Sequence, residues 1–80
     1  MHLEIITPEQ QLFSGEVSLI SLPGTKGLFE ILENHAPIIS TLDPGKIRIV
    51  KKDGNESVFD ITGGVVEGSN NKVSVLVKGS

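Results

Sequence analysis

"KIRIVKKDGNESVFDI", residues 46–61, is the stretch that decides the fold. Ile47 and Ile49 alternate with basic residues before the pair Asp53–Gly54, and a second apolar run, residues 58–61, follows that pair. Alternation with a period of two is typical of a half-buried strand. An Asp-Gly pair between two such runs favours a hairpin with a type I′ turn, whose two central residues both need positive φ. The stretch therefore predicts two antiparallel strands joined by a tight turn.

Short apolar runs that stop at Gly, Pro, Asn or Asp recur along the rest of the chain. "KVSVLVK", residues 72–78, alternates most cleanly, and the other runs stop at Thr7–Pro8, Ser14–Gly15, "PGTKG" (23–27), Glu33–Asn34, "DPG" (43–45), Gly63–Gly64 and "GSNN" (68–71). No helical spacing is sustained. This pattern predicts an all-β fold, a small antiparallel β-sandwich or barrel of about eight to ten short strands, with no C-terminal helical hairpin. In "VSLISL", residues 17–22, the alternation slips between Leu19 and Ile20, which predicts either a bulge or a strand with apolar neighbours on both faces.

Length and composition limit the possible functions. The chain has 80 residues, a net charge of −3 and no cysteine. We expect one domain, residues 1–78, and a short tail at 79–80, without disulfides or thiolate metal sites. The basic residues are dispersed and the only aromatic residues are three Phe, which argues against nucleic-acid binding. No apolar run approaches the roughly 20 residues of a membrane helix, and the N-terminus lacks the basic flank of a signal peptide.

The two histidines are the first candidates for chemistry. His2 and His35 are far apart and no cluster of carboxylates accompanies them, so we expect no metal site. His35 is near Ser40 and Thr41 in sequence, but the chain has no G-x-S-x-G elbow. We therefore expect no catalytic residue and no cofactor. In "ENHAP", residues 33–37, the proline favours extended backbone, so we expect the His35 ring to bond backbone groups and fix a loop.

Three further alternatives are weaker. Glu30 and Glu33 should not converge as an acid–base pair, because we interpret the segment as a strand followed by a turn. "PGTKG", residues 23–27, lacks the phosphate-loop pattern, so we interpret it as a hairpin tip. Lys51 and Lys52 precede a turn, as the acceptor lysine does in lipoyl and biotinyl carrier domains. "KKDGN" does not match those carrier motifs, so we interpret both lysines as solvated.

Nearly the whole chain resembles one family. "LEIITPEQQLFSGEV", "GTKGLFEILENHAPIIS", "LDPGKIRIV" and "ITGGVVE" follow one another before a valine-rich strand. Each motif is short, but their order and spacing over about seventy residues are similar to the N-terminal β-sandwich of the epsilon subunit of F-type ATP synthases, the delta subunit of the mitochondrial enzyme. The resemblance implies a non-catalytic subunit of the central stalk that couples proton-driven rotation to ATP synthesis.

The resemblance also implies partners and a location. The implied contacts with the gamma subunit are Thr7, His35, Ile39, Ser40, Leu42, Thr62 and Gly63, and those with the c-ring are Thr25, Lys26, Gly27 and Leu28. The subunit would lie on the cytoplasmic face of the bacterial inner membrane as part of the complex, without inserting into the bilayer. The isolated domain would be monomeric. A carrier domain for a lipoyl or biotinyl group is the alternative function.

The chain departs from the family pattern in two places. The family often has an acid where Leu28 stands, and Pro-Gly or Pro-Asn where Glu33 begins the pair before His35. The ring contact is therefore expected to depend more on Leu28 packing or on the charge of Lys26. Many relatives continue beyond the sandwich into a helical hairpin that can bind ATP or restrain rotation. The present residues are expected to form the sandwich alone, so neither ATP binding nor inhibition by a hairpin is inferred from them.

Overall fold

The computed structural model describes residues 1–78, and these residues contain strands and short connections without any helix. The strands are β1 (His2–Ile6), β2 (Gln11–Gly24), β3 (Gly27–Leu32), β4 (Ile38–Leu42), β5 (Gly45–Lys51), β6 (Glu56–Ile61), β7 (Gly64–Ser69) and β8 (Lys72–Val77). The predicted all-β fold is confirmed. The tail predicted at 79–80 lies outside the described residues.

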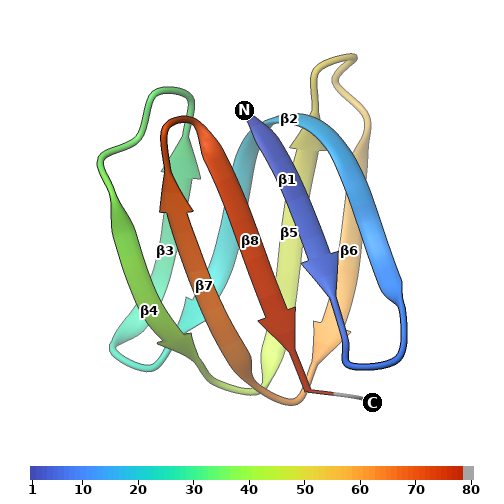
Figure 1. Cartoon of the computed structure of the whole chain (residues 1–80), viewed down its shortest axis with the longest axis vertical. Coiled ribbons are helices and arrows are strands. Elements are labelled where there is room, and N and C mark those ends of the chain that lie inside the picture. Colours follow the sequence, from blue (N-terminus) through green and yellow to red (C-terminus); the bar gives the residue numbers. More distant parts are fainter. Residues whose placement is uncertain (79–80) are drawn as a thin grey trace.

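The strands form two layers (Figure 1). One layer contains β4, β7, β8, β1 and the first half of β2; the other contains β3, the second half of β2, β5 and β6. All pairings are antiparallel except that of β1 with β8, which is parallel. The predicted antiparallel β-sandwich is thus confirmed, with this single parallel pair as an exception. β1 and β8, the first and last strands, lie side by side in the middle of a layer. Because they are far apart in the sequence, they can pair in parallel without a hairpin between them.

β2 passes from one layer to the other without interruption. The sequence predicts a break at Ser14–Gly15, but these two residues pair with Glu4 and Leu3 of β1. The prediction of a break is wrong because the ladder to β1 holds Gly15 in extended backbone. The register against β5 shifts between Val17 and Leu19, slightly before the position that the sequence indicates. The predicted bulge is thereby confirmed, and such an extra residue bends a strand.

The space between the layers is filled by aliphatic side chains. The core consists of Met1, Leu3, Ile5, Val17, Ile20, Leu22, Ile31, Leu42, Ile47, Ile49, Ile61, Val66, Val73, Val75 and Val77. The alternation in residues 46–50 and 72–78 has placed every second residue inside, as predicted. Phe13, Phe29 and Phe59 pack on the margin of this core rather than in its centre. The core is therefore built mainly from β-branched and leucine side chains that fit a pleated surface.

The type I′ turn is not where the sequence predicts it. At Asp53–Gly54 only the glycine has positive φ, +90°, and the Gly54 amide donates to the Lys51 carbonyl at 2.9 Å. This is a longer hairpin loop in which glycine follows the turn, as is common for three-residue loops. Asn70 and Asn71, with φ of 52° and 59°, instead form the two-residue connection between β7 and β8. Asparagine tolerates this conformation better than most residues.

Gly63–Gly64 provides both a bend and a close approach of backbones. Gly63 has a φ of +141°, which favours glycine. At Gly64 a Cβ atom would lie 2.4 Å from the Leu76 carbonyl oxygen, so a side chain cannot fit beside β8. The pair therefore lets the chain turn from β6 into β7 and stay close to its partner strand.

Candidate functional site

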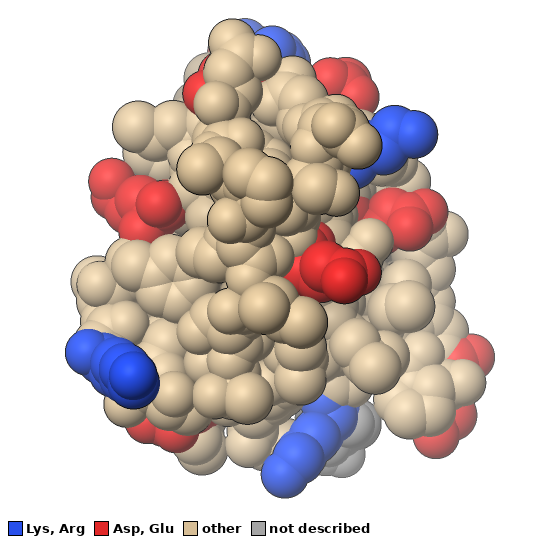
Figure 2. Space-filling view, turned by 60° about the vertical axis from the view of Figure 1, so that its left-hand side comes forward, with Lys and Arg blue, Asp and Glu red and all other residues tan. Residues whose placement is uncertain are grey.

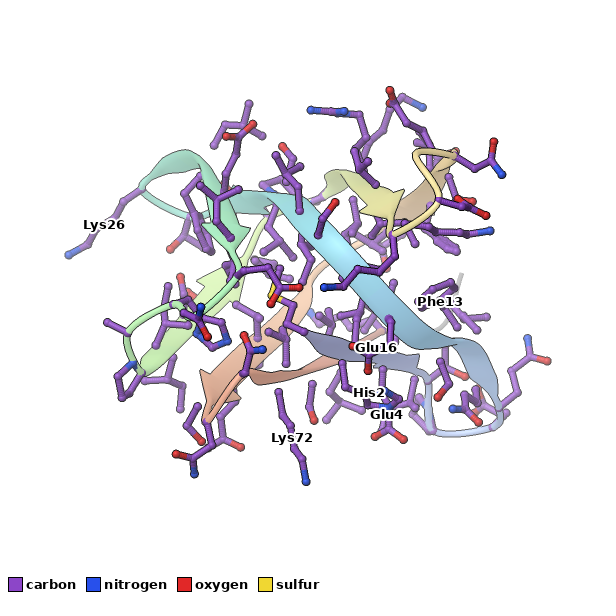
Figure 3. The ribbon with its side chains drawn as sticks, turned by 90° about the horizontal axis from the view of Figure 1, so that it is seen from above. His2, Glu4, Phe13, Glu16, Lys26 and Lys72 are labelled. Carbon is purple, nitrogen blue, oxygen red and sulfur yellow. The ribbon has the colours of Figure 1, made fainter. Side chains whose placement is uncertain are left out.

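The β2–β3 hairpin forms a tight projecting tip. Gly24 pairs with Gly27, so only Thr25 and Lys26 connect the strands. Gly27 has a φ of +127°, and a Cβ atom on Gly24 would lie 2.7 Å from the Phe29 ring. The predicted hairpin tip at residues 23–27 is confirmed. Lys26 extends from it away from the body of the molecule (Figure 3).

Polar contacts fasten this tip to β4. The Thr25 amide donates to the Thr41 carbonyl at 3.1 Å, and the hydroxyl oxygens of the two threonines are 3.0 Å apart. Gly24 also pairs with Leu42, and the Asp43 amide donates to the Pro23 carbonyl at 2.8 Å. The tip therefore has a defined position relative to β4, although the two segments belong to different layers.

A hollow of about 480 Å³ lies between the tip and β4. Its lining consists of Gly24, Thr25, Lys26, Gly27, Leu28, Phe29, Ile39, Ser40 and Thr41. We call this the hairpin hollow. Figure 2 brings this side of the molecule forward, and much of its surface is uncharged, with acidic atoms near the middle of the view and other charged side chains toward its edges. The hollow contains all four residues that the resemblance assigns to the c-ring and two that it assigns to gamma, Ile39 and Ser40.

The other residues assigned to gamma are dispersed. Thr7 lies in the β1–β2 connection, where its hydroxyl accepts the Gln10 amide at 3.0 Å, and Thr62 and Gly63 lie in the β6–β7 connection. Both connections are at the same end of the sandwich as the hairpin hollow (Figure 1). The side chain of Leu42 is only 5% exposed and belongs to the core, so it offers a partner little surface.

His35 lies at the opposite end, in the β3–β4 connection. Its ring donates from Nδ1 to the Ala36 carbonyl at 3.0 Å, as predicted for a residue that bonds backbone in its loop. The ring packs against Gly68, where a Cβ atom would lie 2.9 Å from Cε1. Asn34 precedes it with a φ of 60°, which confirms the predicted turn. Within the described residues, the buried Nε2 atom has no hydrogen-bond partner.

Glu33 joins four segments at this same end. Its carboxylate binds the Met1 ammonium, accepts the Lys52 Nζ at 2.5 Å and accepts the Asn71 amide at 3.1 Å. Asn71 in turn accepts the Asn34 backbone amide at 2.8 Å. The hydrogen bond from Lys52, followed by those from the Met1 ammonium and from Asn71, lowers the pKa of Glu33 to about 2. Glu33 in return raises the pKa of Lys52. We call these residues the Glu33 network.

The Glu33 network corrects one prediction and was missed by the sequence analysis. Lys51 and Lys52 are not simply solvated, since Lys52 binds Glu33 and the Lys51 Nζ lies 5.9 Å from the centre of the Phe13 ring. The network joins residues up to 70 positions apart in the sequence, so no local motif could have revealed it. Glu30 instead faces Arg48 at 3.8 Å, and the expectation that Glu30 and Glu33 do not converge is confirmed.

The surface also carries a serine, a histidine and a carboxylate in a row. Ser14 Oγ lies 3.5 Å from His2 Nε2, and His2 Nδ1 donates to Glu16 at 3.3 Å. Figure 3 shows His2 and Glu16 close to each other on β1 and β2. Ser14 and Glu16 line a shallow hollow beside Lys51 and Lys52, and His2 is not among the residues that line it. The row is best explained as cross-strand polar pairing.

Residues 1–78 form neither a group of side chains suited to a metal ion nor a membrane-spanning helix. Among residues 1–78 no three histidine, cysteine or acidic side chains are grouped so that they could hold a metal ion. The same residues contain no helix that is long and apolar enough to span a membrane. What the fold does offer is a rigid β domain with a shallow, largely uncharged hollow, which is the class of module that binds other proteins.

Comparison with known families identifies the module. Residues 1–79 match the family model described as "ATP synthase, Delta/Epsilon chain, beta-sandwich domain". The chain belongs to this family. It is accordingly a non-catalytic stalk subunit of an ATP synthase, as the sequence resemblance implies.

Two curated relatives are similar over most of their length. The chain is 42% identical over 76 residues to the ATP synthase epsilon chain of Chlorobaculum tepidum, and 43% identical over 76 residues to that of Chlorobium limicola. Each alignment covers 95% of this chain and 86% of the relative. Because both relatives belong to bacterial ATP synthases, the chain is assigned to a membrane-associated complex.

Two solved structures share the fold. A chain of the mitochondrial ATP synthase of Euglena gracilis superposes with a TM-score of 0.88 at 19% identity, covering 94% of this chain. A chain from the central stalk and c-ring of the Tetrahymena thermophila mitochondrial ATP synthase gives 0.81 at 19% identity, covering 98%. The chain spans only 48% and 63% of the lengths of these two proteins.

Proposed function

We propose that the chain is a rotor subunit of an F-type ATP synthase that binds the gamma subunit and the c-ring, and so couples proton-driven rotation to ATP synthesis. The observation that carries this proposal is the hairpin hollow, because one surface contains Thr25, Lys26, Gly27 and Leu28 together with Ile39 and Ser40. A subunit that bridges two partners needs adjacent contact surfaces on a stiff body, and both edges of this hollow lie on strands that share one core.

The gamma contact would follow β4 and the connections beside it. Ile39 and Ser40 lie in the middle of the strand, and His35 precedes it. Thr62 lies in the β6–β7 connection, and Thr7 lies in the β1–β2 connection on the far side of the same layer (Figure 1). The c-ring contact would use the hairpin tip itself. In this arrangement the domain is peripheral on the cytoplasmic face of the membrane, and the complex rather than the domain's own surface holds it there.

Binding to isolated partners tests the proposal. The chain with a C-terminal tag, which leaves the Met1 ammonium free, should bind purified gamma subunit and purified c-ring. We expect the double variant His35→Glu, Ser40→Glu to bind gamma more weakly. Because the His35 ring also packs against Gly68, Ser40→Glu alone should show weaker binding while melting like the original protein. Val58→Glu, on the exposed face of β6, is the matched control and should bind normally. Failure of the original protein to bind either partner would refute the proposed function, while undiminished gamma binding by the double variant would refute the assigned gamma surface.

A further inference from the structure

The β3–β4 connection presents His35, yet it has no ladder of its own. The pairing of β3 with β2 ends at Leu32, and the pairing of β4 with β7 begins at Ile38. Among the described residues, the hydrogen bond that ties the backbone of this connection to another segment runs from the Asn34 amide to Asn71 Oδ1, at 2.8 Å. The position of the connection therefore depends on side chains that come from elsewhere in the chain.

The Asn71 side chain holds two consecutive residues of this connection. Its Oδ1 atom accepts the Asn34 amide, and its Nδ2 atom donates to the Glu33 carboxylate at 3.1 Å. Asn71 is itself fixed, because it lies in the two-residue turn between β7 and β8 and its carbonyl accepts the His2 amide at 3.1 Å. Two contacts from a fixed turn restrict both the position and the orientation of the connection.

Two cations bind the other oxygen of the Glu33 carboxylate. The Met1 ammonium and the Lys52 Nζ both contact Oε1, the latter at 2.5 Å. Met1 is buried, and its ammonium also donates to the Val17 carbonyl at 3.0 Å, so this partner is fixed to the core. Lys52 comes from the β5–β6 connection, which lies at the same end of the sandwich (Figure 1). Glu33 therefore ties the β3–β4 connection to three other segments.

The His35 ring depends on this anchoring for its position. Its Nδ1 atom donates to the carbonyl of the next residue, Ala36, at 3.0 Å, and this local hydrogen bond moves with the connection. Within residues 1–78 the Nε2 atom has no hydrogen-bond partner. The ring otherwise packs against Gly68 of β7, where a Cβ atom would lie 2.9 Å from Cε1. Hydrogen bonds from the ring itself therefore do not fix it relative to the sandwich.

We infer that the Glu33 network positions the gamma contact: Glu33 and Asn71 hold the β3–β4 connection so that His35 is already in place when gamma binds. This inference rests on the proposed function, which assigns His35 to gamma, and specifies how the domain prepares that contact. A connection that is ordered beforehand loses less conformational freedom on binding. Lys52 lies on a connection that carries no residue assigned to gamma, so it acts through Glu33.

Binding of the full chain to purified gamma subunit, measured well below the melting temperature of every variant, tests the inference. We expect Glu33→Gln to weaken binding by about three- to tenfold, the loss expected when one or two side chains must be ordered on association. Lys52→Gln should weaken binding by a smaller factor, because Glu33 keeps its other two donors. Glu30→Gln and Lys51→Gln are the matched controls, since each removes the same charge from the same segment outside the network, and both should bind normally.

A double-mutant cycle separates positioning from direct contact. If Glu33 acts through His35, Glu33→Gln should cause little further loss of gamma binding in a chain that already carries His35→Ala. If Glu33 touched gamma itself, the two losses would add. Binding of the Glu33→Gln chain to purified c-ring provides the second comparison, because general damage to the domain would weaken both partners, whereas a displaced β3–β4 connection should weaken gamma binding alone.

The outcomes separate this inference from the proposed function. Normal gamma binding by Glu33→Gln, additive losses in the cycle, or an equal loss of c-ring binding would each overturn the positioning role and leave the proposed function standing. Losses by the two control variants that match those of the network variants would also overturn it. Normal binding by His35→Ala would overturn the inference together with the assignment of His35 to the gamma surface. Absence of gamma binding by the unchanged chain would refute the proposed function itself.

Discussion

The two ends of the sandwich are built in opposite ways. At one end, the Glu33 network binds the Met1 ammonium, Lys52 and Asn71 to a single carboxylate. At the other end, the hairpin hollow leaves Leu28 and Ile39 exposed and Lys26 without an ion pair in the described residues. The first end uses its polar groups to hold connections together. The second keeps apolar surface uncovered, which is expected of a surface that a partner covers.

The contrast separates stability from binding. The charged groups of the Glu33 network make contacts inside the domain, so their removal should lower the free energy of unfolding. Within the hairpin hollow, Leu28 and Ile39 are largely exposed, so their removal should affect assembly more than unfolding. Four predictions follow the contrast from its largest expected effect on stability to its smallest.

Gly24→Ala should be the most damaging of these changes. The added Cβ atom would lie 2.7 Å from the Phe29 ring and 2.8 Å from the Gly27 carbonyl oxygen, and the backbone oxygen cannot move without opening the hairpin. We expect a loss of about 1–3 kcal/mol in the free energy of unfolding, measured by urea denaturation. Gly68→Ala at the other end should cost less, because its closest neighbour is the movable ring of His35. Equal costs would show that the backbone contact at Gly24 is no more restrictive than the side-chain contact at Gly68.

Glu33→Gln should destabilise the other end. The change leaves the Met1 ammonium and Lys52 without their shared carboxylate. We expect a lower urea midpoint than for Glu30→Gln, whose exposed pair with Arg48 is of a kind worth at most about 1 kcal/mol. Binding to the c-ring should be unchanged, because Glu33 does not line the hairpin hollow. A Glu33→Gln protein as stable as the Glu30→Gln protein would show that the network is not stabilising.

The effect of Glu33 should depend on pH in a defined direction. Its pKa is lowered from 4.5 to about 2 in the folded protein, so its stabilising contribution is complete above 4.5 and disappears as the pH falls toward 2. The difference in urea midpoint between the unchanged protein and Glu33→Gln should therefore shrink over that interval. Equilibrium unfolding at several pH values measures this difference. A difference that stays constant from pH 5 to about 2 would contradict the prediction.

Leu28→Ala and Ile39→Ala should have the smallest effect on stability. Both side chains are largely exposed, at 75% and 72%, so little packing is lost. We expect each free energy of unfolding to stay within about 0.5 kcal/mol of the original. A larger loss of unfolding free energy in either variant would mean that the residue stabilises the fold. Its exposure would then not indicate a surface that binds a partner.

Local patterns predicted most of the fold. The alternation in residues 46–50 and 72–78 identified the buried faces because a strand turns every second side chain inward. The hairpin tip at residues 23–27 was predicted from a local segment that contains glycine and proline, and Gly27 there has a positive φ that other residues rarely adopt. These features depend only on residues that are neighbours in the sequence.

Features that depend on distant segments were not predictable in the same way. The continuity of β2 through Ser14–Gly15 comes from pairing with β1, and the parallel neighbourhood of β1 and β8 joins the two ends of the chain. The Asp-Gly pair was assigned the wrong turn because three residues, rather than two, connect the ladder there. The family resemblance assigned six residues of the hairpin hollow to two different partners, but their meeting on one surface depends on how Thr25 contacts Thr41.

The unbroken course of β2 has a mechanical consequence. Gln11–Gly24 contributes hydrogen bonds to both layers, so the layers are joined by continuous backbone as well as by side-chain packing. A shearing force on one layer is therefore transmitted to the other through peptide bonds. These bonds stretch much less than two packed layers can slide past each other. The domain should yield at its connections before its two layers shift past each other.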